Sequence, residues 1–249
     1  MIWALPQDPE ELLTLALDYP YEAPEWSYLL RAGALMPLTD RQEGGLFEDR
    51  HAVVAHGSNR APDQLLRKFG SNATIPVTYG WLSGYDVVFG AHVARYGAIT
   101  STLAAIPGCQ VRIAVTWLTR QQLARMHESE RMNYSYGHLP ALAFMPEVGP
   151  RPETLSSYVG NRGALLLEGG PVGLEAVQAQ GRPHIAMTQR LMQQQLIDLY
   201  LPGRNVMEVI MERVSDADLR AGFAARLPGS GIEDLGDFKA LKRLDGLLE

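Results

Sequence analysis

The stretch VVAHGSNRAPDQLLRKFG, residues 53–70, predicts a strand that turns directly into a helix. The apolar run before Gly57 is typical of a buried strand, and Pro62 suits a first helical turn, where its missing N–H costs nothing. Gly70 is a common helix terminator. We therefore expect unpaired N–H groups from about residues 58–61 to point outward at the end of a strand. Such a place attracts a carboxylate, a phosphate or a developing oxyanion.

The same turn has plainer interpretations. It could serve only as a tight, well-capped connection between strand and helix. A nucleophilic role for Ser58 is disfavoured because the second glycine of a Gly-x-Ser-x-Gly elbow is absent. No Gly-Lys-Ser/Thr follows, so the turn is not a P-loop. His56 could carry protons, although a histidine at a strand end is more often structural.

A second signal lies about seventy residues farther along, in TRQQLARMHESE, which begins at Thr119. Thr119 and Gln122 form a capping box, which predicts that a helix begins here. At about 100° per residue, Glu130 falls inside the apolar stripe that contains Leu123, whereas Glu128 faces solvent. The sequence therefore predicts a carboxylate on the buried face of this helix.

A glutamate in an inward position is costly unless it is paired or protonated. We expect burial to raise the pKa of Glu130, which suits a group that accepts and later returns a proton near neutral pH. The structural alternatives are a frayed last helical turn and an ion pair with Arg125 or Arg131 that leaves Glu130 half-exposed.

The Gly-Ser-Asn turn and the later segment PGCQVRIAVTWLTRQQLARMHESE together resemble the γ-glutamylcyclotransferase-like superfamily. The resemblance covers about residues 51–170. It implies an α+β fold, a small mixed β-barrel with flanking helices. Around it we expect an N-terminal extension (1–50), a γ-glutamylcyclotransferase-like domain (51–175) and a helical C-terminal extension (176–249). We expect this last segment to pack on the domain and to narrow access to its pocket.

The resemblance also implies the site residues. Glu130 corresponds to the catalytic acid/base of the family. The implied substrate-binding residues are His56, Gly57, Ser58, Asn59, Arg60, Tyr134 and Tyr136. This chain departs from the family pattern at His56, Arg60, His127 and Arg131.

The implied reaction needs no cofactor and no metal. The α-amine of a γ-glutamyl substrate attacks its own γ-carbonyl, which closes the ring of 5-oxoproline and expels an amine or amino acid. Glu130 takes a proton from the ammonium and returns it to the departing nitrogen, while N–H groups of the turn bind a carboxylate or the oxyanion.

Two other classes of function stay open. The four departures favour a non-catalytic module that binds a ligand or a partner on the same fold. A metalloenzyme using His127, Glu128 and His138 is disfavoured because the spacing matches no standard zinc signature. The glycine-rich residues 160–176 lack the strand-turn-helix spacing of a dinucleotide site, and we interpret them as strand and turns.

Composition narrows the class of protein. The 249 residues are 46% hydrophobic and 20% charged, with a formal net charge of −6 and no Lys/Arg run, which disfavours a nucleic-acid partner. Cys109 is the only cysteine, and no signal peptide or membrane span is recognisable. We expect a cytoplasmic protein with a small-molecule γ-glutamyl substrate and no membrane partner; the oligomeric state is open.

Overall fold

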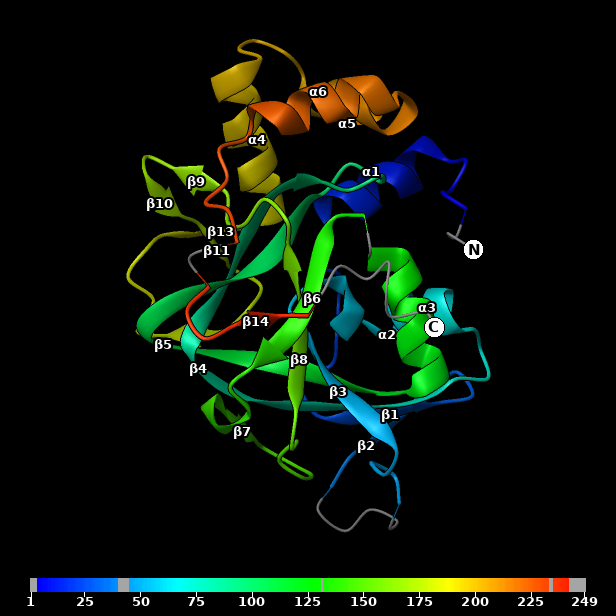
Figure 1. Ribbon diagram of the computed structural model, residues 1–249. Helices are drawn as coiled ribbons and strands as arrows, with labels where there is room; N and C mark the ends of the chain where they lie inside the picture. The colour runs from blue at the N-terminus through cyan, green and yellow to red at the C-terminus, as the bar shows by residue number, and fades with distance from the viewer. Residues whose placement is uncertain (1–3, 40–44, 131, 233–234, 242–249) are drawn as a thin grey trace.

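The computed structural model describes residues 4–39, 45–130, 132–232 and 235–241. Helices pack around a large mixed sheet (Figure 1). The main path through the described strands runs β13-β11-β4-β5-β3-β8-β6-β14. These strands are β3 (Arg50–Ala55), β4 (Thr74–Val93), β5 (Ile99–Thr119), β6 (Tyr134–Leu139), β8 (Leu155–Gly160), β11 (Gly173–Leu174), β13 (Ala186–Met187) and β14 (Lys239–Ala240).

The hairpin of β4 and β5 is the centre of the sheet. Its antiparallel register runs from Val77 opposite Thr116 to Val93 opposite Ile99, with irregularities after Ser83 and after Phe89. Such irregularities bend a strand and increase its twist. The hairpin contributes to both large apolar clusters, which explains why its strands are apolar on both faces.

An α+β fold is confirmed, whereas the predicted small mixed β-barrel is wrong. Among the described strands the path is open, because β13 and β14 at its two ends do not pair with each other. The parallel pairs are β3 with β8 and β11 with β13. The remaining short strands are β1 (Tyr28–Arg31), β2 (Ala34–Pro37), β7 (Phe144–Pro146), β9 (Leu166–Leu167), β10 (Gly170–Pro171) and β12 (Ala179–Gln180).

The N-terminal segment is joined to this sheet. Helix α1 (Pro9–Leu17) is capped by Asp8, whose side chain accepts a hydrogen bond from the N–H of Glu10 at 3.2 Å. Strand β1 then pairs with β4, and Tyr19 packs in the larger apolar cluster. The domain boundaries at residues 50 and 175 stay a prediction.

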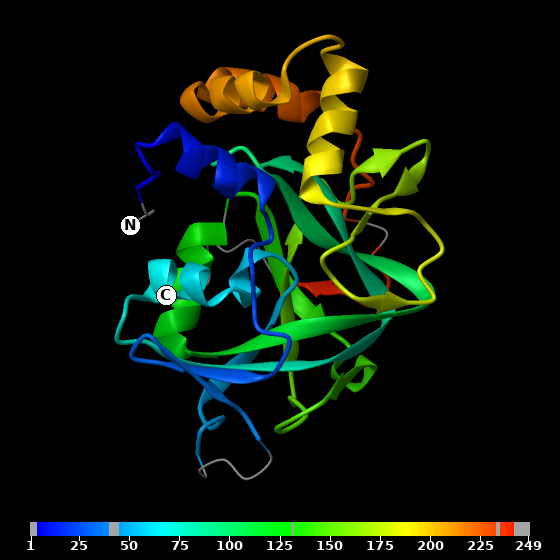
Figure 2. The same cartoon turned by 180° about the vertical axis from the view of Figure 1, so that it is seen from behind.

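The C-terminal helices are α4 (Gln189–Tyr200), α5 (Val206–Ser215) and α6 (Ala217–Arg226). Helix α4 contacts β5, α6 contacts β4, and α5 packs on α1 (Figure 2). The last contact buries Ala16, Leu17 and Ile210 together. Helices α1 and α5, which are far apart in the sequence, therefore support each other on one side of the sheet.

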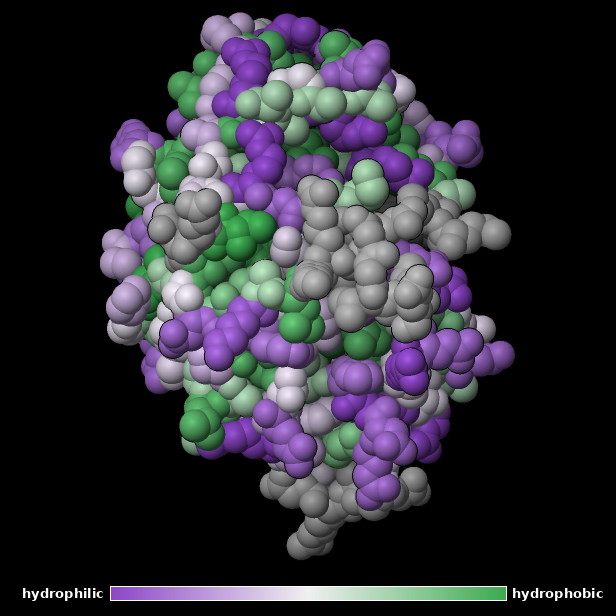
Figure 3. Space-filling view, in the orientation of Figure 1, coloured by the Kyte–Doolittle hydropathy of each residue, from purple (hydrophilic) through white to green (hydrophobic). Residues whose placement is uncertain are grey.

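None of the described helices has the length and apolar character needed to cross a bilayer. In the view of Figure 3, hydrophobic residues form separate patches among hydrophilic ones.

Candidate active site

The strand-turn-helix predicted at residues 53–70 is confirmed. Strand β3 leads into a short 3-10 turn, Ser58–Arg60, and then into α2 (Pro62–Phe69), which ends at Gly70 with φ +85°. The N–H groups of Arg60 and Ala61 donate inside the turn. Within the described residues, those of Ser58 and Asn59 have no hydrogen-bond partner. Two donors, rather than the expected four, are therefore available at this strand end.

A chain of hydrogen bonds fixes the start of the turn. Nε2 of His56 donates to the carbonyl of Tyr158 at 2.7 Å, so Nδ1 accepts from the hydroxyl of Ser101 at 2.9 Å. The Ser101 oxygen in turn lies 2.7 Å from the hydroxyl of Tyr19. Burial lowers the pKa of His56, which keeps the imidazole neutral. His56 therefore orients the loop and has no nitrogen left for a substrate.

The second predicted element, α3 (Arg120–Glu130), also has the expected start. The N–H of Thr119 donates to Oε1 of Gln122 at 2.9 Å, and the N–H of Gln122 donates to Oγ1 of Thr119 at 3.3 Å. At the other end, the Glu130 side chain is only 14% exposed. The inward position expected for this glutamate is confirmed.

Glu130 meets residues of both the turn and α2. Its Oε1 accepts from Nδ2 of Asn59 at 3.3 Å and lies 2.5 Å from Nζ of Lys68. The hydroxyl of Ser129 donates to the same oxygen at 3.3 Å. The acid at the end of α3 and the turn at the end of β3 thus share one site.

The electrostatics of Glu130 differ from the sequence prediction. Burial raises the pKa of its carboxyl, as expected, but the charge and hydrogen bond of Lys68 and the amide of Asn59 lower it. The net effect is a pKa below the ordinary value for glutamate. The expected raised pKa is therefore wrong, because Lys68, together with Asn59, outweighs the effect of burial. Glu130 is ionised at neutral pH.

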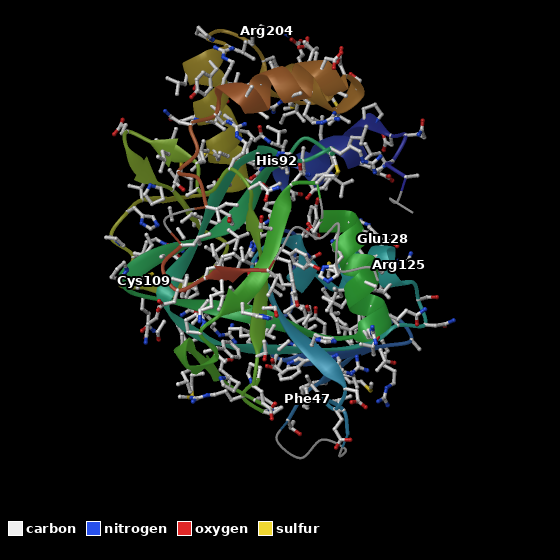
Figure 4. The ribbon with its side chains drawn as sticks, viewed as in Figure 1. Phe47, His92, Cys109, Arg125, Glu128 and Arg204 are labelled. Atoms are coloured by element: carbon white, nitrogen blue, oxygen red, sulfur yellow. The ribbon has the colours of Figure 1, made fainter. Side chains whose placement is uncertain are left out.

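These groups surround a cavity of about 640 Å³. In Figure 4, Arg125 and Glu128 extend from α3, and His92 extends from β4; all three line this cavity. The predicted site residues that line it are His56, Gly57, Ser58, Asn59, Glu130 and Tyr134.

Arg60 and Tyr136 do not line the cavity. The guanidinium of Arg60 donates to the carbonyl of Ala176 at 3.0 Å, on the other side of the turn. The ring of Tyr136 packs edge-on against His127, with centroids 4.7 Å apart. Both side chains therefore contribute to the packing around the site rather than to its wall.

The candidate metal ligands do not come together. His127 is buried and hydrogen-bonds with the hydroxyl of Tyr158 at 2.7 Å, whereas His138 bonds with Ser156 at 3.1 Å. Glu128 lies at the cavity. In the described part of the chain, no group of three or more His, Cys, Asp or Glu side chains could hold a metal ion. Arg131, the last of the four positions at which the chain departs from the family pattern, lies outside the described residues.

Several cavity residues were not predicted from the sequence, among them Tyr19, Lys68 and Tyr158. Lys68 had a detectable signal, because it lies three residues after the buried Leu65 and four after the buried Gln64. The helical wheel that selected Glu130 would have placed Lys68 on the buried face of α2. Tyr19 and Tyr158 reach the cavity through long-range packing, which has no local pattern.

The C-terminal helices act on the site indirectly. None of the described cavity residues comes from α4, α5 or α6. The narrowing of the entrance by these helices stays a prediction. They hold the β4–β5 turn, residues 94–98, which contributes Arg95 and Tyr96 to the wall. A buried amide of Gln193 donates to the carbonyl of Gly97 at 2.8 Å.

Comparisons with known proteins find solved structures that resemble this chain at low sequence identity. No family model and no curated protein matches the chain. A solution structure of an Arabidopsis thaliana protein is 14% identical, covers 61% of this chain and 89% of its own, and has a TM-score of 0.38. A γ-glutamyl cyclotransferase is 12% identical, with coverages of 80% and 97% and a TM-score of 0.37. An uncharacterized Homo sapiens protein is 14% identical, with coverages of 80% and 98% and a TM-score of 0.37. These values do not assign a family or an activity to the chain.

Proposed function

We propose that this protein cyclises a γ-glutamyl group to 5-oxoproline and releases an amine or amino acid, with Glu130 as the acid/base. One observation carries the proposal: the buried Glu130 carboxylate lies 3.3 Å from the Asn59 amide, in a cavity that also contains the strand-end turn. The cavity volume is in the range of small-molecule sites.

Each part of the reaction has a candidate group in the cavity. The ionised carboxylate of Glu130 attracts the α-ammonium of the substrate and takes its proton. The free N–H groups of Ser58 and Asn59 stabilise the substrate carboxylate or the oxyanion that forms on the γ-carbonyl. Holding the amine near its own carbonyl makes the ring closure intramolecular, which removes much of the entropic cost.

A second candidate is a module that binds an acidic or zwitterionic small molecule without turnover. The ion pair between Lys68 and Glu130 at 2.5 Å favours it, because a carboxylate with a lowered pKa is a weaker base. The two candidates share the ligand chemistry and differ in the chemical step.

The deciding experiment incubates the protein with γ-glutamyl amino acids, amines and peptides and measures 5-oxoproline. The proposal requires turnover by the wild type and a loss of about 10²–10⁴-fold in Glu130→Gln, which cannot transfer the proton. Glu208→Gln, at an exposed position of α5 that does not line the cavity, is the control for the lost charge. If neither the wild type nor Glu130→Gln forms 5-oxoproline, and a γ-glutamyl compound binds saturably, the binding module is favoured instead.

A further inference from the structure

The two oxygens of the Glu130 carboxylate have different surroundings. Oε1 receives hydrogen bonds from Lys68, Asn59 and Ser129. Oε2 has no partner within the described residues, and it is not one of the fully buried atoms that lack one. Because Glu130 lines the cavity, Oε2 is the oxygen that a ligand can reach.

Lys68 is held by three contacts. Its Nζ lies 2.5 Å from Oε1 of Glu130, 3.0 Å from the hydroxyl of Ser129 and 3.4 Å from the sulfur of Met126. The side chain is only 9% exposed. An ammonium group has three N–H donors, so these contacts use all of them. Lys68 therefore acts on the carboxylate and has no free donor for a ligand.

We propose that Lys68 is a positioning residue that fixes Oε1 of Glu130 and presents Oε2 to a protonated primary amine of the ligand. This inference rests on the proposed function for the identity of that amine, the α-ammonium of a γ-glutamyl group. The division of roles between the two oxygens stands on the contacts alone. Because Oε1 already accepts three hydrogen bonds, the amine of the ligand can bind only at Oε2.

Lys68 also sets the pH range over which the site can hold a cation. The titratable groups that interact electrostatically with Glu130 are Lys68 of α2, His56 after β3, Tyr19 of the N-terminal segment, His92 of β4, Tyr134 of β6 and Tyr158 of β8. The charged side chains of Arg67 on α2 and of Arg125 and Glu128 on α3 line the same cavity. Of all these groups, Lys68 makes the largest contribution that favours the ionised carboxylate. Without it, burial is the larger influence and the carboxyl takes up its proton at a higher pH.

The test is a titration of Glu130 followed by NMR in protein labelled with ¹³C at the glutamate side-chain carboxyl. Glu130→Gln identifies the signal by its disappearance. We expect Glu130 to titrate below a free glutamate in the wild type and at a higher pH in Lys68→Met. Lys68→Arg, which keeps the charge, and Arg120→Met, which removes an exposed cation at the start of α3, should resemble the wild type.

An unchanged titration midpoint of Glu130 in Lys68→Met, or a wild-type midpoint above that of free glutamate, would refute the proposal. The second criterion needs no variant to fold.

A second measurement separates this inference from the proposed function. The affinity for L-glutamine, which carries an α-ammonium and a γ-amide, is measured between pH 4 and 8. The loss of binding on acidification should occur at a higher pH in Lys68→Met and be restored in Lys68→Arg. If no γ-glutamyl compound is turned over but the carboxyl titration shifts as stated, the proposed reaction fails and the role of Lys68 stands. If turnover occurs and its acid limb is the same with and without Lys68, the reaction stands and this role fails.

Discussion

The hydroxyl of Tyr19 lies against the α-carbon of Gly57, and the hydroxyl of Ser101 lies beside it. A β-carbon at position 57 would be 2.7 Å from Oγ of Ser101 and closer still to the Tyr19 hydroxyl. The backbone of Gly57 has φ −118°, so the constraint is contact and not a left-handed conformation. Glycine is needed here because a residue from the N-terminal segment packs directly under the turn.

Gly57→Ala should therefore destabilise the protein and displace the turn. Overpacking of a filled interior costs about 1–3 kcal/mol in the free energy of unfolding. Urea denaturation measures the cost, and Gly222→Ala in α6, where a β-carbon meets nothing within 4 Å, is the control that should not destabilise. Tyr19→Phe removes the nearest atom and also two buried hydrogen bonds with Ser101, so the two changes are compared in a double-mutant cycle. Gly57→Ala should cost less in the Tyr19→Phe background than in the wild type, and an equal cost in both backgrounds would contradict this account.

Local signals in the sequence were sufficient to predict both elements of the site. The Thr119–Gln122 capping box located the start of α3, and helical periodicity placed Glu130 on its buried face. Pro62 and Gly70 correctly bounded α2. These predictions depend on contacts within about one helical turn, where sequence spacing translates directly into geometry.

The charge state of the site could not be predicted in this way. It depends on Lys68, which is 62 residues from Glu130 in the sequence and belongs to another helix. Closure of the sheet was also mispredicted, because it depends on how far the bulged β4–β5 hairpin curves. No local pattern in the sequence shows whether the two edge strands of the sheet pair with each other.

His92 should make the protein less stable in mild acid. Burial, followed by the positive charges of Arg162 and Arg220, lowers its pKa to about 4. The unfolded chain, with a pKa near 6.5, then binds more protons between about pH 6.5 and 4, so stability falls as the pH falls through this range. The loss between pH 7 and 4.5 is about 2–3 kcal/mol in urea unfolding.

His92→Gln should remove most of that loss, whereas His51→Gln, at an exposed position, should leave it unchanged. The ring signals of His92 give the titration directly by NMR. A midpoint near 6.5 for His92 would show that this group does not cause the acid sensitivity.

The buried Asp86 should be costly to leave without its partners. Its carboxylate is 0% exposed and accepts two hydrogen bonds from Arg182, at 2.6 and 2.8 Å, and one from Nε2 of His184 at 2.9 Å. Removing one partner of a buried pair typically costs about 3–5 kcal/mol. Arg182→Met should therefore lower the free energy of unfolding by roughly this amount.

The matched control for that change is Arg190→Met, which breaks a pair with Asp18 whose side chains are 61% and 47% exposed. Exposed pairs contribute about 1 kcal/mol or less. Similar losses in the free energy of unfolding of the two variants would mean that the buried Asp86 carboxylate does not depend on Arg182 for its stabilisation.

Gln193 should link the C-terminal helices to the wall of the cavity. Its side chain is fully buried, its amide donates to the carbonyl of Gly97, and its Oε1 accepts from Arg213 at 2.7 Å. Gln193→Ala leaves both partners without this contact, at a cost of about 2–4 kcal/mol, since one of them is a buried guanidinium. We expect faster amide hydrogen exchange at residues 94–98, because their turn loses its support. Gln194→Ala, one position along on the exposed face of α4, should change neither quantity. Unchanged exchange at residues 94–98 in Gln193→Ala would show that the cavity wall is stable without the C-terminal helices.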